Sequence, residues 1–231
     1  MPENPSVPID WKPAALPRPV NLPGRYVTLE TLGAGHGTDL WQAIHGHDEL
    51  WTWMAGESAP SPAALLEQLA RWREAEKAVL FAIVSADTKK AAGWASYMRI
   101  AEAHGVIEIG NVVFSPELQR TRAATEAVYL MARHVFEDLG YRRYEWKCHS
   151  ENAPSRRAAL RFGFTFEGIF RQHMVVKGRN RDTAWFAMLD HEWPARKKAF
   201  ETWLDPKNFD AVGRQRRSLT EIAASVGPMP A

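Results

Sequence analysis

Short apolar runs in the first half of the chain have the length and composition of β-strands. They lie at residues 25–31, Val79–Ser85, Ala91–Ile100 and Ile107–Phe114, with polar or Gly-containing turns between the last three. β-Branched and aromatic residues dominate the last run. Pro116 has no N–H to donate to a ladder, so this strand should end before it. The pattern predicts four antiparallel strands in meander order, with helices at Thr38–His45 and Ala63–Lys77.

A helical apolar period begins after the fourth strand. The residues that carry it are Ala124, Ala127, Val128, Met131, Val135 and Leu139. They predict a helix that starts near Ala123 and ends at Gly140, a residue able to take the left-handed conformation. A strand at Tyr141–Cys148 follows, and because a helix connects it to the fourth strand, the two should pair in parallel. The predicted fold class is therefore mixed α/β.

The rest of the chain predicts one more helix, a hairpin and a C-terminal helix. Asn152 can cap the helix, and Pro154 lies in its first turn, where a missing N–H costs nothing. The hairpin strands are Met174–Val176 and Asp182–Leu189, and the last helix is Pro194–Leu204. We expect a Pro-rich N-terminal arm at residues 1–23, one domain at 24–190, and a C-terminal segment at 191–231. That last segment would consist of a helix followed by a polar tail, Asp205–Ala231.

Composition narrows the class of protein. With 231 residues, 45% hydrophobic and 24% charged, the chain can bury a real core. The net charge of +2 is too small to indicate a nucleic-acid partner. The single cysteine, Cys148, excludes an internal disulfide and indicates a reducing, cytoplasmic compartment. No apolar run is long enough to cross a bilayer, and the scattered histidines lack zinc spacing, so we expect no membrane and no metal.

The junction between the fourth strand and the following helix is a candidate anion site. The first N–H groups of a helix have no intrahelical acceptor, and the positive end of the helix dipole lies beside them. Arg120 and Arg122 add charge at the same place, so a phosphate would fit there. The alternative is an ordinary helix start with solvated arginines.

Two motifs resemble those of the GNAT-type N-acetyltransferases. Residues 119–124, Gln-Arg-Thr-Arg-Ala-Ala, are similar to the family pattern Q/R-x-x-G-x-G/A, although the branch of the family that this chain most resembles usually has glycines in place of Arg120 and Arg122. Asn152 and Ser155, followed by Phe-Gly-Phe at 162–164 and Glu-Gly at 167–168, are similar to the motif beside the pantetheine thiol. The flanks look most like the branch that acetylates ribosomal-protein N-termini.

The resemblance implies a fold, an activity and a set of binding residues. The fold would be a central, mostly antiparallel sheet of about seven strands, flanked by helices and splayed around a cofactor crevice. The activity would be transfer of an acetyl group from acetyl-CoA to a primary amine by direct transfer in a ternary complex. The implied cofactor-binding residues are Val112, Val113, Phe114, Gln119, Arg120, Thr121, Arg122, Ala123, Ala124, Thr125, Asn152 and Ser155.

The resemblance also suggests the catalytic groups. Ser155, with Asn152, would contact the thiol, and Ser155 would donate to the departing sulfur. Many relatives place a tyrosine where this chain has Ala159, and Met174 replaces a carboxylate used in the ribosomal-protein branch. The general base therefore stays open among Glu108, His149 and His173, each of which could instead have a structural role.

The acceptor is less well defined. Trp51, Trp53 and Trp94 would form an acceptor wall by resemblance, but core packing is the alternative, because Trp is mostly buried. A peptide N-terminus or a small-molecule amine would suit the site, and the chain would act as a monomer or homodimer. The alternative function is a catalytically inactive module that binds coenzyme A or a protein partner.

Overall fold

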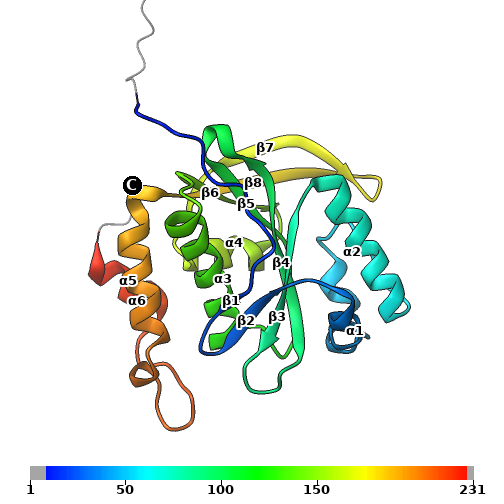
Figure 1. Ribbon diagram of the computed structural model, residues 1–231, viewed down its shortest axis with the longest axis horizontal. Helices are drawn as coiled ribbons and strands as arrows, with labels where there is room; N and C mark the ends of the chain where they lie inside the picture. Colours follow the sequence, from blue (N-terminus) through cyan, green and yellow to red (C-terminus); the bar gives the residue numbers. More distant parts are fainter. Residues whose placement is uncertain (1–8, 228–231) are drawn as a thin grey trace, which may run out of the picture.

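A computed structural model describes residues 9–227, and its centre is one open eight-stranded sheet (Figure 1). The strand order is β1-β2-β3-β4-β5-β6-β8-β7, and only β5 and β6 are parallel neighbours. The predicted fold class and the predicted parallel pair are both confirmed. The strand beyond the expected seven is β1, which has two residues and is too short to leave a sequence pattern. The strands are β1 (Leu22–Pro23), β2 (Val27–Thr31), β3 (Val79–Ser85), β4 (Ala91–Ala101), β5 (Val106–Phe114), β6 (Arg143–His149), β7 (Thr165–Val176) and β8 (Arg179–Leu189).

Helices cover both faces of the sheet, and each face has its own apolar core (Figure 1). One core lies under α1 and α2, and the other lies under α3 and α4, with α5 and α6 outside α3. Tyr97 and Phe186 are central to the core beneath α3, while Leu65 and Trp94 belong to the core beneath α2. The helices are α1 (Gly37–Ile44), α2 (Pro62–Glu76), α3 (Arg122–Arg133), α4 (Ala153–Arg161), α5 (Trp193–Leu204) and α6 (Leu219–Val226).

Local side-chain caps determine where α3 and α4 start. Thr121 Oγ1 accepts from Ala124 N at 3.1 Å, and α3 begins one residue before the predicted start. Asn152 Oδ1 accepts from Ser155 N at 3.1 Å, so Asn152 caps α4 as expected. A π-helical turn, His134–Asp138, follows α3, and Gly140 then takes a left-handed conformation. Both helix starts are thus encoded locally.

The described part of the N-terminal arm crosses the surface and is attached to the domain by hydrogen bonds. Trp11 Nε1 donates to Ala103 O at 2.8 Å. Farther along, the buried carboxylate of Glu126 in α3 accepts the backbone N–H groups of residues 25–27. These bonds link the entry to β2 to the first turns of α3, although residues 1–8 of the predicted arm lie outside the described residues.

The prediction of a polar tail is wrong for the described residues beyond 205. This segment contains α6, whose apolar side chains Leu219, Ile222 and Ala223 are buried beside α5. Ser218 and Glu221 form a capping box at its start. The apolar stripe spans only about one turn, so the polar residues around it obscure it in the sequence. Residues 228–231 of the predicted tail lie outside the described range. No helix between residues 9 and 227 has both the length and the apolar character needed to span a membrane.

Candidate active site

The parallel strands β5 and β6 separate before β5 ends. Their pairing runs from Val106 with Arg143 to Ile109 with Trp146, whereas β5 continues to Phe114. Asn111, at the point of separation, has φ of 47° and interrupts the regular strand. Between residues 9 and 227, the segment 111–114 pairs with β4 on one side and has no strand partner on the other. We call this gap in the pairing of β5 and β6 the slot.

The open edge leads directly into a loop with unpaired backbone donors. Within the described chain, the N–H groups of Arg120, Arg122 and Ala123 have no hydrogen-bond acceptor, whereas Ala124 N is satisfied by Thr121. Arg120 has φ of 61°, the left-handed region that favours glycine, which fits the resemblance to a branch that usually has glycine at this position. Free N–H groups and the dipole of α3 form a site suited to a phosphate group.

Arg122 does not extend freely into solvent. Its guanidinium lies between the rings of Tyr26 and Phe209, 4.9 and 4.7 Å from their centroids. Stacking uses the faces of the guanidinium and leaves its N–H edges available for a phosphate. Arg120 and Gln119 are exposed, and Gln119 Nε2 donates to Phe114 O at 3.1 Å. Cofactor contacts by these three residues stay a prediction.

A further arginine, which sequence reasoning missed, lies beside the first turn of α3. Arg161, at the end of α4, donates from Nη1 to Thr125 Oγ1 at 3.1 Å. Its guanidinium also lies 4.9 Å from the ring centroid of Trp203, and burial lowers its pKa. It adds positive charge near the unpaired N–H groups. The only sequence signal was its position at the end of a helix that contains a thiol-site motif.

Ser155 lies where α4 meets β6. Its Oγ accepts from Trp146 Nε1 at 3.0 Å, and its N–H donates to the Asn152 cap. Neither of these bonds uses the hydroxyl proton, and the Cys148 thiol is a further side-chain hydrogen-bond partner of Ser155. Cys148 is buried nearby, and burial raises the pKa of its thiol, so it does not have the features of a nucleophile. Ala159, which occupies the position of the family tyrosine, is fully buried.

The opposite face of the slot contains a buried network of charges. Lys147 Nζ lies 3.0 Å from Glu108 Oε2 and 2.8 Å from Glu145 Oε2, and Arg99 Nε lies 3.2 Å from Glu108 Oε2. Lys147 also lies 3.5 Å from the ring centroid of Trp185. Burial raises the pKa of Glu108, although Lys147 and Arg99 lower it. Glu108 therefore lies on the same face of the sheet as Lys147, and it is ion-paired.

Both histidines that could act as the general base have hydrogen-bond partners within the protein. Nδ1 of His149 accepts from Glu151 N at 3.1 Å, which puts the proton of the neutral ring on Nε2. His173 Nδ1 is 2.9 Å from Thr183 Oγ1, and burial lowers its pKa. Both therefore have structural contacts, and the identity of the general base stays a prediction.

The three predicted acceptor-wall tryptophans divide into two groups. Trp51 and Trp94 are buried in the core beneath α1 and α2, with ring centroids 6.2 Å apart. Trp53 is half-buried, and its ring lies 4.8 Å from that of His149 in β6. The 3₁₀ turn η2 (Asp48–Trp51) and the following residues thus extend across the sheet toward the slot.

The hairpin of β7 and β8 also reaches this region. It runs over the end of the sheet toward α2, and Lys177 Nζ at its tip donates to Trp51 O at 3.0 Å (Figure 1). Trp185 and Arg181 on β8 are on the same face as Lys147. Sequence reasoning missed Lys147, Arg181 and Trp185. The available signal was the alternation of polar residues along the strands at 143–149 and 179–189.

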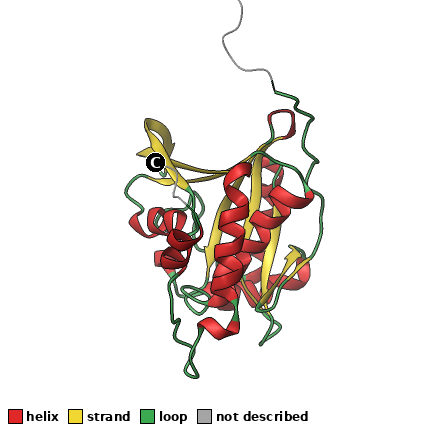
Figure 2. Ribbon diagram, turned by 90° about the vertical axis from the view of Figure 1, so that its left-hand side faces the viewer, coloured by secondary structure: helices red, strands yellow, loops and turns green. Residues whose placement is uncertain are grey.

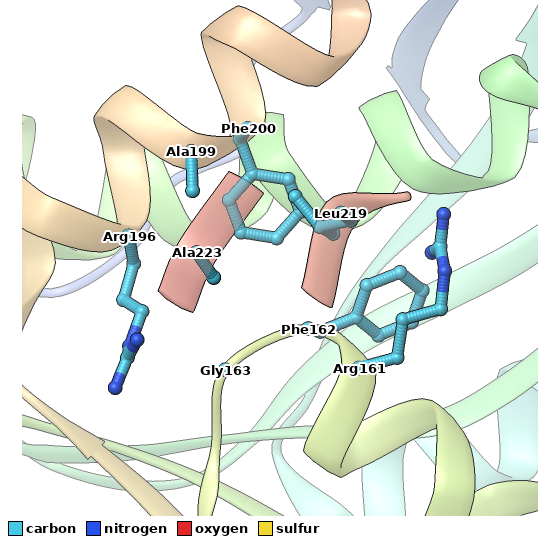
Figure 3. Close-up of a pocket in the computed structure, with 8 residues that line it drawn as sticks. All are labelled: Arg161, Phe162, Gly163, Arg196, Ala199, Phe200, Leu219 and Ala223. Atoms are coloured by element: carbon cyan, nitrogen blue, oxygen red, sulfur yellow. The ribbon is translucent and has the colours of Figure 1, made fainter. Parts of the chain in front are cut away.

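A small hollow lies away from the slot, between the end of α4 and the helices α5 and α6 (Figure 3). Its volume of about 10 Å³ is near the minimum for one water molecule, so it cannot hold a substrate. The guanidinium groups of Arg161 and Arg196 point away from each other at its two ends. The hollow is a packing gap.

No metal site is evident in the part of the chain that the structure describes. Residues 9–227 contain no group of three or more His, Cys, Asp or Glu side chains placed to hold a metal ion. The site therefore consists of backbone donors, arginines, a serine and the buried charge network.

Comparison with known proteins agrees with this geometry. Residues 27–165 match the family described as "Acetyltransferase (GNAT) domain". The chain is 28% identical over 127 residues to YoaA, an uncharacterized N-acetyltransferase of Bacillus subtilis, covering 55% of this chain and 71% of that protein.

Solved structures show the same relationship. A GCN5-related N-acetyltransferase from Brucella melitensis is 48% identical with a TM-score of 0.90, covering 93% of this chain and 99% of that one. A ribosomal-protein-S5-alanine acetyltransferase from Vibrio fischeri has 18% identity and a TM-score of 0.62, covering 75% and 98%. At that identity the likeness shows the fold alone.

Proposed function

Because the chain belongs to the GNAT acetyltransferase family, we propose that it transfers the acetyl group of acetyl-CoA to a primary amine by direct transfer in a ternary complex. The observation that carries this proposal is the separation of β5 from β6 beyond Ile109, which joins an open strand edge to unpaired N–H groups at the start of α3. The cytoplasm, which the sequence suggests, is the proposed location.

The residues present fit the cosubstrate along the whole slot. The open edge of Val112–Phe114 offers backbone groups to the amides of the pantetheine arm. The N–H groups of Arg120, Arg122 and Ala123 face no protein acceptor in the described chain and suit pyrophosphate oxygens. Arg161 adds charge beside them. Ser155, across the slot on α4, is suited to the thiol end.

The chain supplies mainly position and proton transfer. Acetyl-CoA provides an activated acyl thioester, so the protein must orient a neutral amine and protonate the departing thiolate. Ser155 can donate its hydroxyl proton to the sulfur while it keeps the bond from Trp146. Glu108 belongs to the charge network, and its pKa is raised. A carboxylate with a raised pKa is suited to accept a proton from the amine, either directly or through water.

Thiol release tests the proposal. Purified protein is mixed with acetyl-CoA and a panel of small amines and short peptides with free N-termini, and free coenzyme A is measured with a thiol reagent. Amine-dependent release together with an acetylated product in mass spectra supports the proposed transfer. Coenzyme A binding by calorimetry without turnover of any amine would support the inactive binding module instead.

The unusual arginine at the start of α3 provides a test of the cofactor site. We predict that Arg122→Glu weakens coenzyme A binding by about 2 kcal/mol or more, because it removes a charge-assisted contact and introduces repulsion. Calorimetric titration at low and moderate salt measures the effect, which should be larger at low salt.

A control separates binding from packing. Phe209→Leu removes one of the two rings that hold Arg122 but keeps its charge, so it should weaken binding less than Arg122→Glu does. If Arg122→Glu binds coenzyme A as tightly as the wild type, the arginine has only a packing role with Tyr26 and Phe209.

A further inference from the structure

The acceptor side of the slot contains buried hydrogen-bond donors that have no acceptor. Four such N–H groups are found in the described chain: Nε1 of Trp51, Trp94 and Trp185, and Nε of Arg181. Buried polar groups are normally paired, and each unpaired one carries a desolvation cost. All four lie on the α1–α2 face of the sheet, on either side of the slot.

Arg181 differs from the other cations of this face. Lys147, Arg99 and Arg143 each form an ion pair with Glu108, Glu145 or Glu167. Between residues 9 and 227, Arg181 forms no ion pair. An arginine stays protonated in proteins, so its charge remains available to a ligand.

Arg181 is also near the place where the thioester would lie. Two contacts place this part of β8 beside the end of β6. Thr183, two residues after Arg181, pairs with His149, and Ser150 N donates to Asp182 O at 2.8 Å. Burial lowers the pKa of Arg181, while Cys148 and Glu108 oppose this shift through their charges. The guanidinium is thus partly desolvated, beside the Glu108 network and the end of β6.

We propose that the acceptor is a primary amine carrying an acidic group, a carboxylate or a phosphate, and that Arg181 binds this group at the side of the slot. The inference rests on the proposed acetyl transfer and adds the class of acceptor. A guanidinium binds carboxylate and phosphate oxygens in the same bidentate geometry. The unpaired indole N–H of Trp185, whose ring packs against Lys147, supplies a further donor and no negative charge, so it favours an oxygen-rich ligand.

Matched acceptors with and without an acidic group test the proposal. The pairs are β-alanine with β-alaninamide, O-phosphoethanolamine with ethanolamine, and C-terminally amidated Ala-Asp-Gly with amidated Ala-Asn-Gly. We expect at least one acidic member to have a kcat/KM about 10-fold to 100-fold above its neutral partner, as one charge-assisted pair would provide. The three pairs distinguish a carboxylate, a phosphate and a peptide as the source of the acidic group.

Variants assign the preference to one residue. Arg181→Gln should reduce the ratio within the preferred pair to about twofold, mainly through the acceptor KM, with little change for the neutral partner. Arg181→Lys should keep part of the preference. Arg18→Gln removes the same charge from an exposed arm residue and should leave the ratio unchanged. Thermal melts confirm that each variant is folded.

Three outcomes would overturn the inference or its premise. Equal rates for acidic and neutral partners in the wild type would reject the acidic acceptor while leaving acetyl transfer intact, and an unchanged ratio in Arg181→Gln would reject the role of Arg181. If no amine is acetylated, calorimetric titration of the same pairs into the protein with bound coenzyme A tests the preference by binding alone. No binding of coenzyme A would overturn the proposed function and this inference together.

Discussion

At the scale of single residues, Ser155 has the most specific expected role. We predict that Ser155→Ala lowers kcat roughly 100-fold, as expected for loss of a proton donor that acts in the transition state, and changes the Kd of acetyl-CoA little. Steady-state kinetics and calorimetry measure the two quantities. A loss of affinity with unchanged kcat would contradict the donor role.

The hydrogen bond from Trp146 requires a control for this variant. Ser155→Ala leaves the indole N–H of Trp146, a buried residue, without its acceptor and should cost about 1 kcal/mol of stability. Trp146→Phe removes the same bond and keeps the hydroxyl. If both variants lose activity in proportion to their stability, Ser155 has a structural role only.

Glu108 should make stability depend on pH in a characteristic direction. Burial raises its pKa above the ordinary value of about 4.5, despite Lys147 and Arg99, so the folded protein binds this proton more tightly than the unfolded chain does. Its contribution to the free energy of unfolding is therefore fully present below pH 4.5 and declines as pH rises through the raised pKa.

We predict that Glu108→Gln removes this decline. Urea unfolding from pH 4 to pH 8 should give a wild-type free energy that falls relative to the variant as pH rises. Glu74→Gln, on the exposed side of α2, is the control and should follow the wild type. Parallel profiles for the wild type and Glu108→Gln would show that Glu108 does not bind its proton more tightly in the folded state.

At the scale of elements, the β7–β8 hairpin and the η2 turn together border the proposed acceptor side of the slot. They are distant in sequence, and the hydrogen bond from Lys177 Nζ to Trp51 O at 3.0 Å connects them. Figure 2 shows the hairpin projecting beyond the helices that cover the sheet. A projecting hairpin held at its tip by one side chain can determine how an acceptor enters.

We predict that Lys177→Met raises the acceptor KM about threefold to 10-fold, the range expected for loss of one hydrogen bond, and leaves coenzyme A affinity unchanged. Arg179→Met changes a neighbouring exposed cation that has no bond to η2 and serves as the control. Equal kinetic effects in the two variants would exclude a specific role for the Lys177 contact.

At the scale of the whole molecule, the C-terminal helices extend the core on the α3 side. The buried side chain of Ile222 in α6 contributes to that core, and Tyr129 in α3 donates to Glu201 Oε1 in α5 at 2.8 Å. Phe209, in the connection between α5 and α6, packs on Arg122. The C-terminal segment therefore supports the wall of the proposed cofactor site.

We predict that Ile222→Ala lowers the free energy of unfolding by about 2–4 kcal/mol, through lost burial and a residual cavity. Ile9→Ala makes the same change at a side chain that is 60% exposed and should cost less than about 0.5 kcal/mol. Denaturant titration measures both. Similar losses would mean that α6 contributes little to the stability of the domain.

Much of the secondary structure could be predicted because it depends on nearby residues. The apolar runs indicated β3, β4 and β5, and Asn152, the expected cap, lies at the observed start of α4. The short strand β1 and the helix α6 were missed, because each has too few residues to show a period.

The sequence by itself determined the family, the order of the main strands and helices, and the candidate anion site at residues 119–125, where α3 begins. Periodicity, turns and caps act between neighbours along the chain, so they can be recognised without the fold. Only the tertiary structure decided that Arg122 lies between Tyr26 and Phe209, that Lys147 pairs with Glu108, and that Arg181 is left without an ion pair in the described chain. These contacts join segments far apart in sequence, and strand register and helix packing alone bring them together.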